Sequence, residues 1–542
     1  MEKFTVKGVL VMPRDRQMYG AVISIANGKI ASIERDDTVE GPYILPGFVD
    51  SHIHIESSML IPSQFARLAV KHGTVAVVTD PHEVANVAGE DGVRFMIADS
   101  KTVPLKFFFG VPSCVPASPM EKSGAVLNAS DVVRMISDPE FYFLAEMMNF
   151  PGVFNNDPQV VGKLNAAKQY NKPIDGHAPG LKGDDLISYV KAGISTDHEC
   201  STTSEALEKI ALGQKIQLRE GSAARNFNSL SPLITDNAAS LMFCTDDCHP
   251  DYLMSGHINK VVAKAVSKGY DLYDVLTIAT YNPVSHYSLP VGQLNVGDTA
   301  DFIITEDLVN FNILETYIDG AKVYSKEKLL FNTPRQHPPA FPFRTNIPTV
   351  EQLKVTSTGT TMNVIEAIPG ELLTNWLKIE VQAGSKVSSN ISTDMLKIVL
   401  LDRYSDTPPV VAFIKGFGLK SGALAASIAH DSHHILCVGV DDESIQAALQ
   451  WIVVSKGGLC FANQGKVAGI KLPFFGLMTN EPGEEVSKQY EELNRHILSS
   501  GCNINAPFMT ASFMALTVIP NLKINHNGLF DINKFCSVPL FH

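Results

Sequence analysis

The chain has 542 residues, of which 45% are hydrophobic and 19% charged, a composition typical of large folded domains rather than of a disordered chain. Its 44 Lys and Arg residues against 57 Asp and Glu residues give a net charge of −13, which disfavours binding to nucleic acid or to an anionic membrane surface. No apolar run approaches the roughly 20 residues of a membrane span, the N-terminus lacks the layout of a secretion signal, and the eight cysteines include no CxxC pair, so we expect a cytoplasmic protein with reduced thiols.

Two separated segments have the alternating pattern of short antiparallel strands. Residues 1–45 alternate apolar and polar positions around turn signals at Asn27-Gly28 and Gly41-Pro42. A similar pattern returns at 291–331, where Gly292 and Gly297 punctuate short apolar runs. The two segments predict one small β-sandwich that is interrupted by a long insertion.

The insertion, residues 46–290, consists of repeated units of a strand followed by a helix. Helix-length stretches such as 62–72 and 158–170 lie between most of eight apolar runs, which are 48–54, 75–80, 106–110, 141–146, 173–177, 194–198, 215–220 and 241–246. Eight such units predict a (β/α)8 TIM-like barrel, in which catalytic groups lie at the C-terminal ends of the strands. A Pro-rich linker at 332–345 then precedes a C-terminal α+β domain at 346–542.

Polar side chains that can bind metals occur at the ends of five of these runs. His52 and His54 are two residues apart on a strand, so both rings point to the same face. The other candidates are Glu146, His177, His198 and Asp246. Together they can hold two divalent cations, with His52 and His54 on one, His177 and His198 on the other, Glu146 between them, and Asp246 as a further ligand and as the base for a water molecule.

The competing interpretation is that these polar groups only pair with one another at the strand ends. It requires burying six titratable groups without a metal, which costs several kcal/mol for each unpaired charge. We therefore favour a metal site. Such cations lower the pKa of bound water from 15.7 toward about 7, which indicates hydrolytic chemistry.

The run Pro46-Gly47-Phe48-Val49-Asp50-Ser51-His52-Ile53-His54 resembles the first-strand signature of the amidohydrolase superfamily. Further segments resemble the bacterial and archaeal adenine deaminase family within it; they include 55–59, 80–87, 175–180, 195–199, 244–247, 415–419 and 429–434. The resemblance implies hydrolysis of adenine to hypoxanthine and ammonia in purine salvage or catabolism. It also implies two divalent metals, commonly manganese or iron, although the same nitrogen and oxygen ligands accept zinc.

Residue by residue, the resemblance assigns His52 and His54 to one metal, His177 and His198 to the other, and Glu146 to the bridging position. Asp246 matches the strand-8 aspartate and is expected to act as the proton acceptor. His82 and Glu83 follow the second strand and can bind the edge of the purine, relay protons or support neighbouring side chains. We therefore predict Asp246, Glu146, His82 and Glu83 as the catalytic residues.

Two alternatives remain open at this stage. The first keeps the metal barrel but changes the substrate, as in deacetylases and cyclic-amide hydrolases. The second is a non-catalytic relative that uses the fold for binding, although all six ligand positions are filled here. We expect a small-molecule substrate and neither a nucleic-acid nor a membrane partner, and the sequence leaves open whether the chain forms a homo-oligomer.

Overall fold

The computed structural model describes residues 3–542, which form two compact units. The first contains the chain up to Pro81 together with Arg94–Cys114 and Leu127–Gln336, and the second contains His82–Val93, Val115–Val126 and His337–His542. Helix α2 (His82–Ser100) is kinked at Gly89, where φ is 60°, and contributes to both units. No helix in the described part of the chain is long and apolar enough to cross a membrane.

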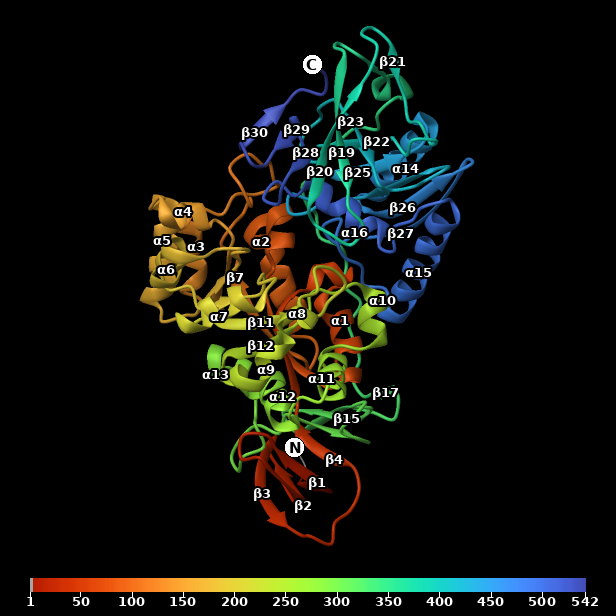
Figure 1. The fold of residues 1–542 in the computed structure, drawn as a ribbon. Helices are drawn as coiled ribbons and strands as arrows, with labels where there is room; N and C mark the ends of the chain where they lie inside the picture. Colours follow the sequence, from red (N-terminus) through yellow and green to blue (C-terminus); the bar gives the residue numbers. More distant parts are fainter. Residues whose placement is uncertain (1–2) are drawn as a thin grey trace. The chain divides into compact units, whose positions relative to one another are not determined.

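The first unit is built on eight strands that correspond one for one to the predicted runs. They are β5 (Phe48–His54), β6 (Thr74–Thr79), β7 (Lys106–Val111), β8 (Phe141–Met147), β9 (Ile174–Gly176), β10 (Thr196–Asp197), β11 (Lys215–Arg219) and β12 (Leu241–Cys244). Figure 1 labels β7, β11 and β12 among them. Strands β5 to β9 pair in sequence order, and so do β10 to β12. The pairing is parallel throughout.

Contacts between the two strand sets close the sheet into a barrel. Ser195 N donates to Ile174 O at 2.8 Å, which joins the β10 side to β9. At the other seam Ser51 Oγ donates to Phe243 O at 2.8 Å, and the short strand β13 (Asp246–Asp247) pairs with β5. Because the sheet returns to its first strand, the C-terminal ends of all its strands face one mouth.

Helices follow most of these strands, and the start of α5 (Pro158–Gln169) has a clear local cause. In α5, Pro158 occupies the first turn and the Asp157 side chain accepts from the backbone N–H groups of Gln159 and Val160. The others are α1 (Pro62–Ala69), α3 (Ala129–Ile136), α4 (Phe150–Phe154), α6 (Gly183–Lys191), α7 (Thr203–Ala211), α8 (Phe227–Leu230), α9 (Ile234–Asn237), α10 (Pro250–Ser255), α11 (Ile258–Ser267), α12 (Leu272–Ala279) and α13 (Tyr281–Tyr287). Helices α8, α11 and α12 pack against β11 and β12 in one apolar core.

The small β domain is one continuous sheet of eight strands within the described residues, in the order β17-β16-β15-β14-β4-β1-β2-β3. Strand β4 (Tyr43–Pro46) pairs with both β1 (Phe4–Met12) and β14 (Phe302–Thr305), so it joins the segments before and after the barrel. The remaining strands are β2 (Gln17–Ala26), β3 (Lys29–Arg35), β15 (Ile313–Ile318), β16 (Ala321–Ser325) and β17 (Lys328–Leu329). Their inward side chains form a separate apolar core, which includes Leu10, Ile23 and Phe302.

The second unit contains an eight-stranded mixed sheet in the order β20-β19-β23-β22-β25-β24-β26-β27. Its strands are β19 (Thr361–Ala367), β20 (Thr374–Glu380), β22 (Leu396–Leu401), β23 (Val410–Lys415), β24 (Ala423–Ala426), β25 (Ile435–Gly439), β26 (Gly458–Asn463) and β27 (Lys466–Lys471). Helix α14 (Asp442–Ser455) packs its apolar residues on this sheet. The unit also contains α15 (Gly483–Ser499), α16 (Pro507–Ser512), β18 (Val355–Thr356), β21 (Lys386–Val387), β28 (Leu522–Asn525), β29 (Gly528–Asp531) and β30 (Cys536–Val538).

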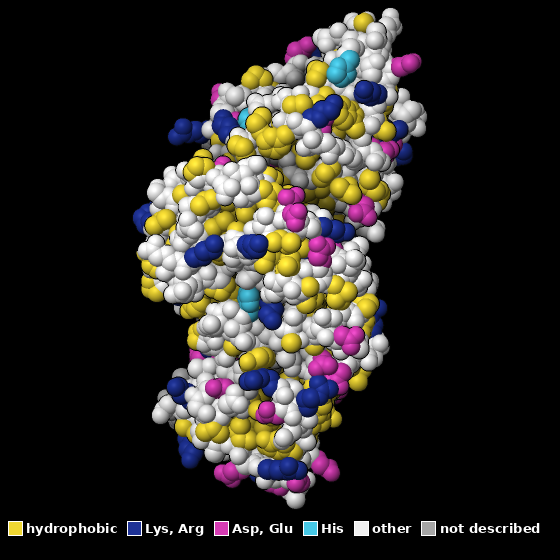
Figure 2. Space-filling model, turned by 60° about the vertical axis from the view of Figure 1, so that its left-hand side comes forward, with side chains coloured by type: hydrophobic (Ala, Val, Ile, Leu, Met, Phe, Trp, Pro, Cys, Tyr) yellow, Lys and Arg dark blue, Asp and Glu magenta, His cyan; other side chains and the backbone are white. Residues whose placement is uncertain are grey.

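This architecture confirms the predicted fold class of a barrel inserted in a small β domain and followed by an α+β segment. The numerical domain limits stay predictions. On the face shown in Figure 2, acidic and basic side chains are interspersed and few histidines are visible. Eight of the 16 histidines are buried, and they include His52, His54 and His198 of the first unit.

Candidate metal centre

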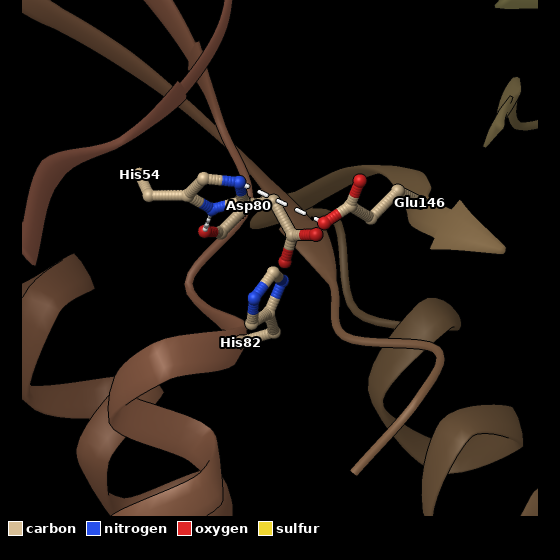
Figure 3. A group of neighbouring side chains, drawn as sticks. All are labelled: His54, Asp80, His82 and Glu146. Carbon is tan, nitrogen blue, oxygen red and sulfur yellow. Dashed lines mark hydrogen bonds and ion pairs between the residues drawn. The ribbon is translucent and has the colours of Figure 1, made fainter. Parts of the chain in front are cut away.

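The first histidine pair, His52 and His54, lies on β5, whose seven residues are all buried. The strand pleat directs both rings to the same side, and their centroids are 4.9 Å apart. His54 Nδ1 donates to the backbone oxygen of Asp80 at 2.9 Å (Figure 3). This hydrogen bond places the proton on Nδ1 and leaves the lone pair of Nε2 available for a cation.

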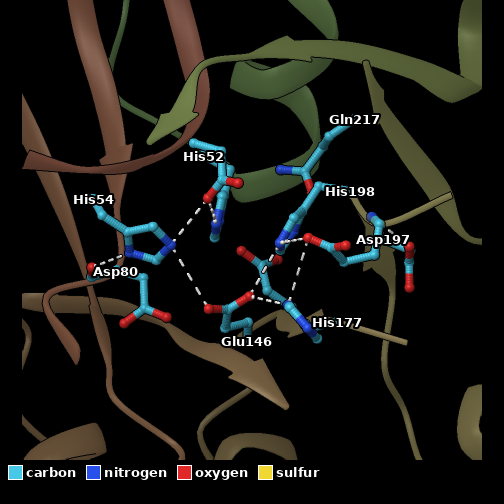
Figure 4. A network of polar contacts seen from close by, with 12 residues as sticks. His52, His54, Asp80, Glu146, His177, Asp197, His198 and Gln217 are labelled. Atoms are coloured by element: carbon cyan, nitrogen blue, oxygen red, sulfur yellow. Dashed lines mark hydrogen bonds and ion pairs between the residues drawn. The ribbon is translucent and has the colours of Figure 1, made fainter. Parts of the chain in front are cut away.

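The second histidine pair, His177 and His198, comes from the ends of two neighbouring strands, β9 and β10. Their ring centroids are 5.4 Å apart. The His198 ring also stacks on His52, with 4.1 Å between centroids and 19° between the ring planes. The two pairs are therefore contiguous inside the barrel (Figure 4).

Glu146 lies near the end of β8, between the two histidine pairs. One of its carboxylate oxygens faces the first pair and the other faces the second pair. Its Oε1 lies 3.7 Å from His54 Nε2. Its Oε2 lies 3.0 Å from His177 Nδ1 and 3.1 Å from His198 Nε2 (Figure 4). A carboxylate placed in this way can bind two cations at once.

Asp246 lies where β13 meets β5, with a backbone φ of 55°. Its Oδ1 lies 3.1 Å from His54 Nε2 and 3.5 Å from His52 Nε2. Its Oδ2 accepts a hydrogen bond of 2.6 Å from the Arg219 guanidinium. The structure thus brings all six sequence-predicted ligands, His52, His54, Glu146, His177, His198 and Asp246, into one cluster.

The electrostatics of the cluster are those of buried carboxylates among imidazoles. Burial alone would raise the pKa of Glu146, but His177 and His198 outweigh burial and hold that pKa well below its usual value. Burial would also raise the pKa of Asp246, which Arg219 and the first histidine pair hold well below the usual value. Burial acts against protonation of His177, yet nearby Glu199 and Glu146 raise its pKa to about 9.

The donor set fits divalent cations. Neither ring nitrogen of His52 nor Nδ1 of His198 has a hydrogen-bond partner among the described residues, although these atoms are buried. Several groups of potential ligand atoms lie within 4.8 Å of one another; those formed by this cluster include His52, His54 and Asp246; His52, Glu146 and His198; and His177, His198 and Glu199. Ligands of one cation at about 2.1 Å from it are separated by similar distances.

Comparisons with known proteins identify the family of the chain. A model of the amidohydrolase family matches residues 43–323, and one of the adenine deaminase C-terminal domain matches residues 371–536. The chain is 48% identical to Adenine deaminase of Methanosarcina barkeri, with 99% of both chains covered. It is 46% identical to Adenine deaminase of Borreliella burgdorferi, covering 99% of this chain and 100% of that one. Among solved structures, an enamidase of the amidohydrolase superfamily is 17% identical, with a TM-score of 0.46, over 62% of this chain and 99% of that one.

This chain belongs to the adenine deaminase family. It is therefore an enzyme of the amidohydrolase type, and family membership implies that it uses a divalent metal. The match covers nearly the whole length of the curated adenine deaminases, including the C-terminal segment. The resemblance inferred from the sequence motifs is confirmed.

The sequence analysis did not identify two charged residues, Glu199 and Arg219, that contact the predicted metal ligands of this adenine deaminase family member. Glu199 directly follows His198, and its Oε1 lies 3.6 Å from His198 Nε2. Arg219, at the end of β11, donates through Nη1 to both Glu199 and Asp246. Both positions lie at strand ends, which was the only signal in the sequence that could have found them.

A buried lysine supports the second histidine pair. Lys209, on α7, is completely buried and donates to Ala178 O at 2.7 Å and to Glu205 Oε1 at 3.0 Å. Its Nζ also lies 3.2 Å from Asp197 Oδ2. Because Ala178 follows His177 and Asp197 precedes His198, Lys209 ties together the two strand ends that carry the pair.

His82 and Glu83, the other predicted catalytic residues, begin α2 and belong to the second unit. There His430 Nδ1 donates to Glu83 Oε1 at 2.6 Å, and His433 Nε2 donates to Glu83 Oε2. His433 Nδ1 accepts from Ala429 N at 3.3 Å, which fixes the proton on Nε2. Burial would raise the pKa of Glu83, but the two histidines hold it well below its usual value.

Proposed function

We propose that this protein hydrolyses adenine to hypoxanthine and ammonia at a centre of two divalent cations, in purine salvage or catabolism. The observation that carries the proposal is the placement of Glu146, whose two oxygens face two separate histidine pairs. His52 and His54 would hold one cation and His177 and His198 the other, with Glu146 shared and Asp246 on the side of the first pair. Manganese or iron is the expected metal, with zinc as a further candidate.

Bound divalent cations would supply hydroxide at neutral pH, because they lower the pKa of a water molecule toward about 7. Asp246 is held in its carboxylate form by Arg219 and can therefore accept a proton when water attacks the amino-bearing carbon of adenine. The same carboxyl group can then deliver this proton to the departing ammonia. Glu146 keeps the two histidine pairs in register without the carbon dioxide that a carbamylated lysine would require.

The proposal is tested on purified protein that has been stripped of metal with a chelator. Adenine is supplied with manganese, iron or zinc at up to two equivalents per chain, and the change in absorbance and the release of ammonia are followed. We expect activity to rise until two equivalents are bound. Ammonia-free turnover of an acetylated amine or a cyclic amide, with adenine untouched, would instead show a different amidohydrolase activity.

The role of Asp246 is tested separately with Asp246→Asn. Asparagine keeps the shape of the side chain but cannot accept the proton, so turnover should be lost while much of the metal remains bound. Metal content by elemental analysis provides the second readout. Normal activity in this variant would remove Asp246 from the mechanism.

His82 and Glu83 are also proposed to take part in the reaction, because they follow Asp80 at the C-terminal end of β6. The structure holds Glu83 as an anion between two imidazole N–H groups, which suits a hydrogen-bond acceptor. Glu83→Gln should lower turnover by more than it changes metal content, and His82→Asn should raise KM. Unchanged kinetics in both variants would leave them with a purely structural role.

A further inference from the structure

Arg219 is a charged side chain in direct contact with Asp246, one of the six predicted metal ligands, and it has itself no assigned role as a ligand or a base. The residue is 4% exposed and lies at the C-terminal end of β11. Its Nη1 donates to Asp246 Oδ2 at 2.6 Å and to Glu199 Oε1. One guanidinium group is therefore shared by two buried carboxylates.

This contact divides the two oxygens of Asp246 between different partners. Oδ1 faces the Nε2 atoms of His52 and His54, at 3.5 and 3.1 Å, while Oδ2 faces Arg219. A carboxylate without such an anchor rotates about its last side-chain bond and can present either oxygen, or both, to a cation. The Asp246 backbone is also in the left-handed region, with a φ of 55°, which is uncommon for a residue other than glycine.

The guanidinium itself is held from behind by the loop that follows β11. Arg219 Nε donates to Ala224 O at 2.7 Å, and Arg219 N donates to Asn226 Oδ1 at 2.7 Å. Asn226 Nδ2 in turn donates to His198 O at 2.9 Å. The same loop therefore fixes Arg219 and one ligand of the second histidine pair.

We propose that Arg219 is a positioning residue, which occupies Asp246 Oδ2 so that Oδ1 alone faces the first histidine pair. Glu199 balances the guanidinium charge, so that the arginine can remain buried beside Asp246. The inference rests on the proposed function only where it expects a misplaced Asp246 to lower adenine turnover. The positioning itself concerns this chain's own side chains.

The experiment replaces Arg219 with alanine and then adds guanidinium ion at concentrations too low to unfold the protein. Adenine turnover of the metal-loaded Arg219→Ala variant should fall on the order of 100-fold, as expected when a reacting group is displaced by about 1 Å. Bound metal should stay near the wild-type content, and the loss should appear in kcat rather than in KM. Guanidinium should restore much of the activity, because it can refill the space between Asp246 and Glu199.

A second readout does not depend on turnover. Cobalt(II) is loaded in place of the native metal, and its visible absorption spectrum reports the oxygen ligands around it. We expect the spectrum of Arg219→Ala to differ from that of the wild type and to return toward it when guanidinium is added. An unchanged spectrum would overturn the proposal whatever the substrate of the enzyme proves to be.

Two further variants keep the result interpretable. Arg94 is also an arginine between two carboxylates, with Nη1 at 2.6 Å from Asp138 and 3.4 Å from Glu140, but its side chain is partly exposed and its carboxylate partners are not among the predicted ligands. Arg94→Ala should retain wild-type activity and spectrum and show no response to guanidinium. If Arg219→Ala does not fold, Arg219→Lys is used, because a single ammonium group cannot reproduce the shared contact.

The outcomes separate the two proposals. A wild-type protein that does not deaminate adenine refutes the proposed function, and the cobalt spectra then decide on Arg219 alone. An active wild type with an equally active Arg219→Ala variant refutes the positioning role and leaves the proposed function standing. A loss of activity that follows loss of metal, with no guanidinium effect, also refutes the role, since it would show that Arg219 only stabilises the fold.

Discussion

Replacing Lys209 with methionine should destabilise the barrel strongly, because this side chain neutralises buried carboxylates. Lys209 is completely buried, with Nζ at 3.0 Å from Glu205 and 3.2 Å from Asp197, two residues that are themselves buried. Methionine preserves most of the packing but removes the ammonium group that both buried carboxylates share, and removal of one partner from a buried ion pair costs about 3–5 kcal/mol. The lost hydrogen bond to Ala178 O adds about 1 kcal/mol.

The assay is urea-induced unfolding of the metal-free protein, followed by circular dichroism. We expect Lys209→Met to lower the free energy of unfolding by about 4 kcal/mol. The matched control is Lys215→Met, because the Lys215 ammonium makes a single contact with a backbone oxygen at the surface and its loss should cost less than about 1 kcal/mol. A difference between the two variants of under about 1 kcal/mol would refute the reasoning, since it would mean that Asp197 and Glu205 do not need the charge.

Three further predictions concern single positions. Burial and the nearby charge of Asp431 raise the pKa of Glu121 to about 7, so folding favours the neutral form of this carboxyl group. The free energy of unfolding of the wild type, relative to Glu121→Gln, should therefore fall by about 3 kcal/mol as pH rises from below 4.5 to above 7. Urea unfolding of both proteins across this pH range measures the effect. Tyr189→Phe leaves the N–H of His177 and the carbonyl of Met147 without their hydroxyl partner, and should cost about 1–3 kcal/mol in thermal or urea unfolding. A Cβ on Gly221 would meet Thr245 O at 1.9 Å, so Gly221→Ala should displace the backbone before Asp246 and reduce adenine turnover on the order of 100-fold in a steady-state assay.

The barrel and the clustering of the six candidate ligands could be predicted from the sequence because the relevant information is local. Each apolar run is a few residues long, and the predicted runs at 48–54 and 141–146 match β5 (Phe48–His54) and β8 (Phe141–Met147) within one residue. In a parallel barrel the C-terminal ends of the strands meet at one mouth. Side chains of the types that bind metals, when they occur at several strand ends, are therefore expected to lie close together. No knowledge of the intervening helices was needed.

The composition of the second unit could not be predicted, because it depends on contacts between distant segments. Glu83 and His433 are 350 residues apart in the chain. Residues 115–126 also belong to this unit, where Glu121 accepts from Ser432 and Thr517. A short segment that leaves the barrel and returns carries no pattern that marks which domain it will join, because its partners are fixed only when the chain is folded.

The two histidine pairs depend on different physical causes, and this difference explains which parts of the centre the sequence concealed. The first pair shares one strand, so the pleat alone places both rings on one side. The second pair comes from two strands, and its geometry depends on buried groups that tie those strands together, among them Lys209, Tyr189 and Asn226. Such groups bind backbone atoms or other side chains rather than a cation, so their residue types do not indicate a metal site in the sequence. Substitutions there should disturb the second pair before the first, since the pleat of a single strand cannot hold His177 and His198 in register.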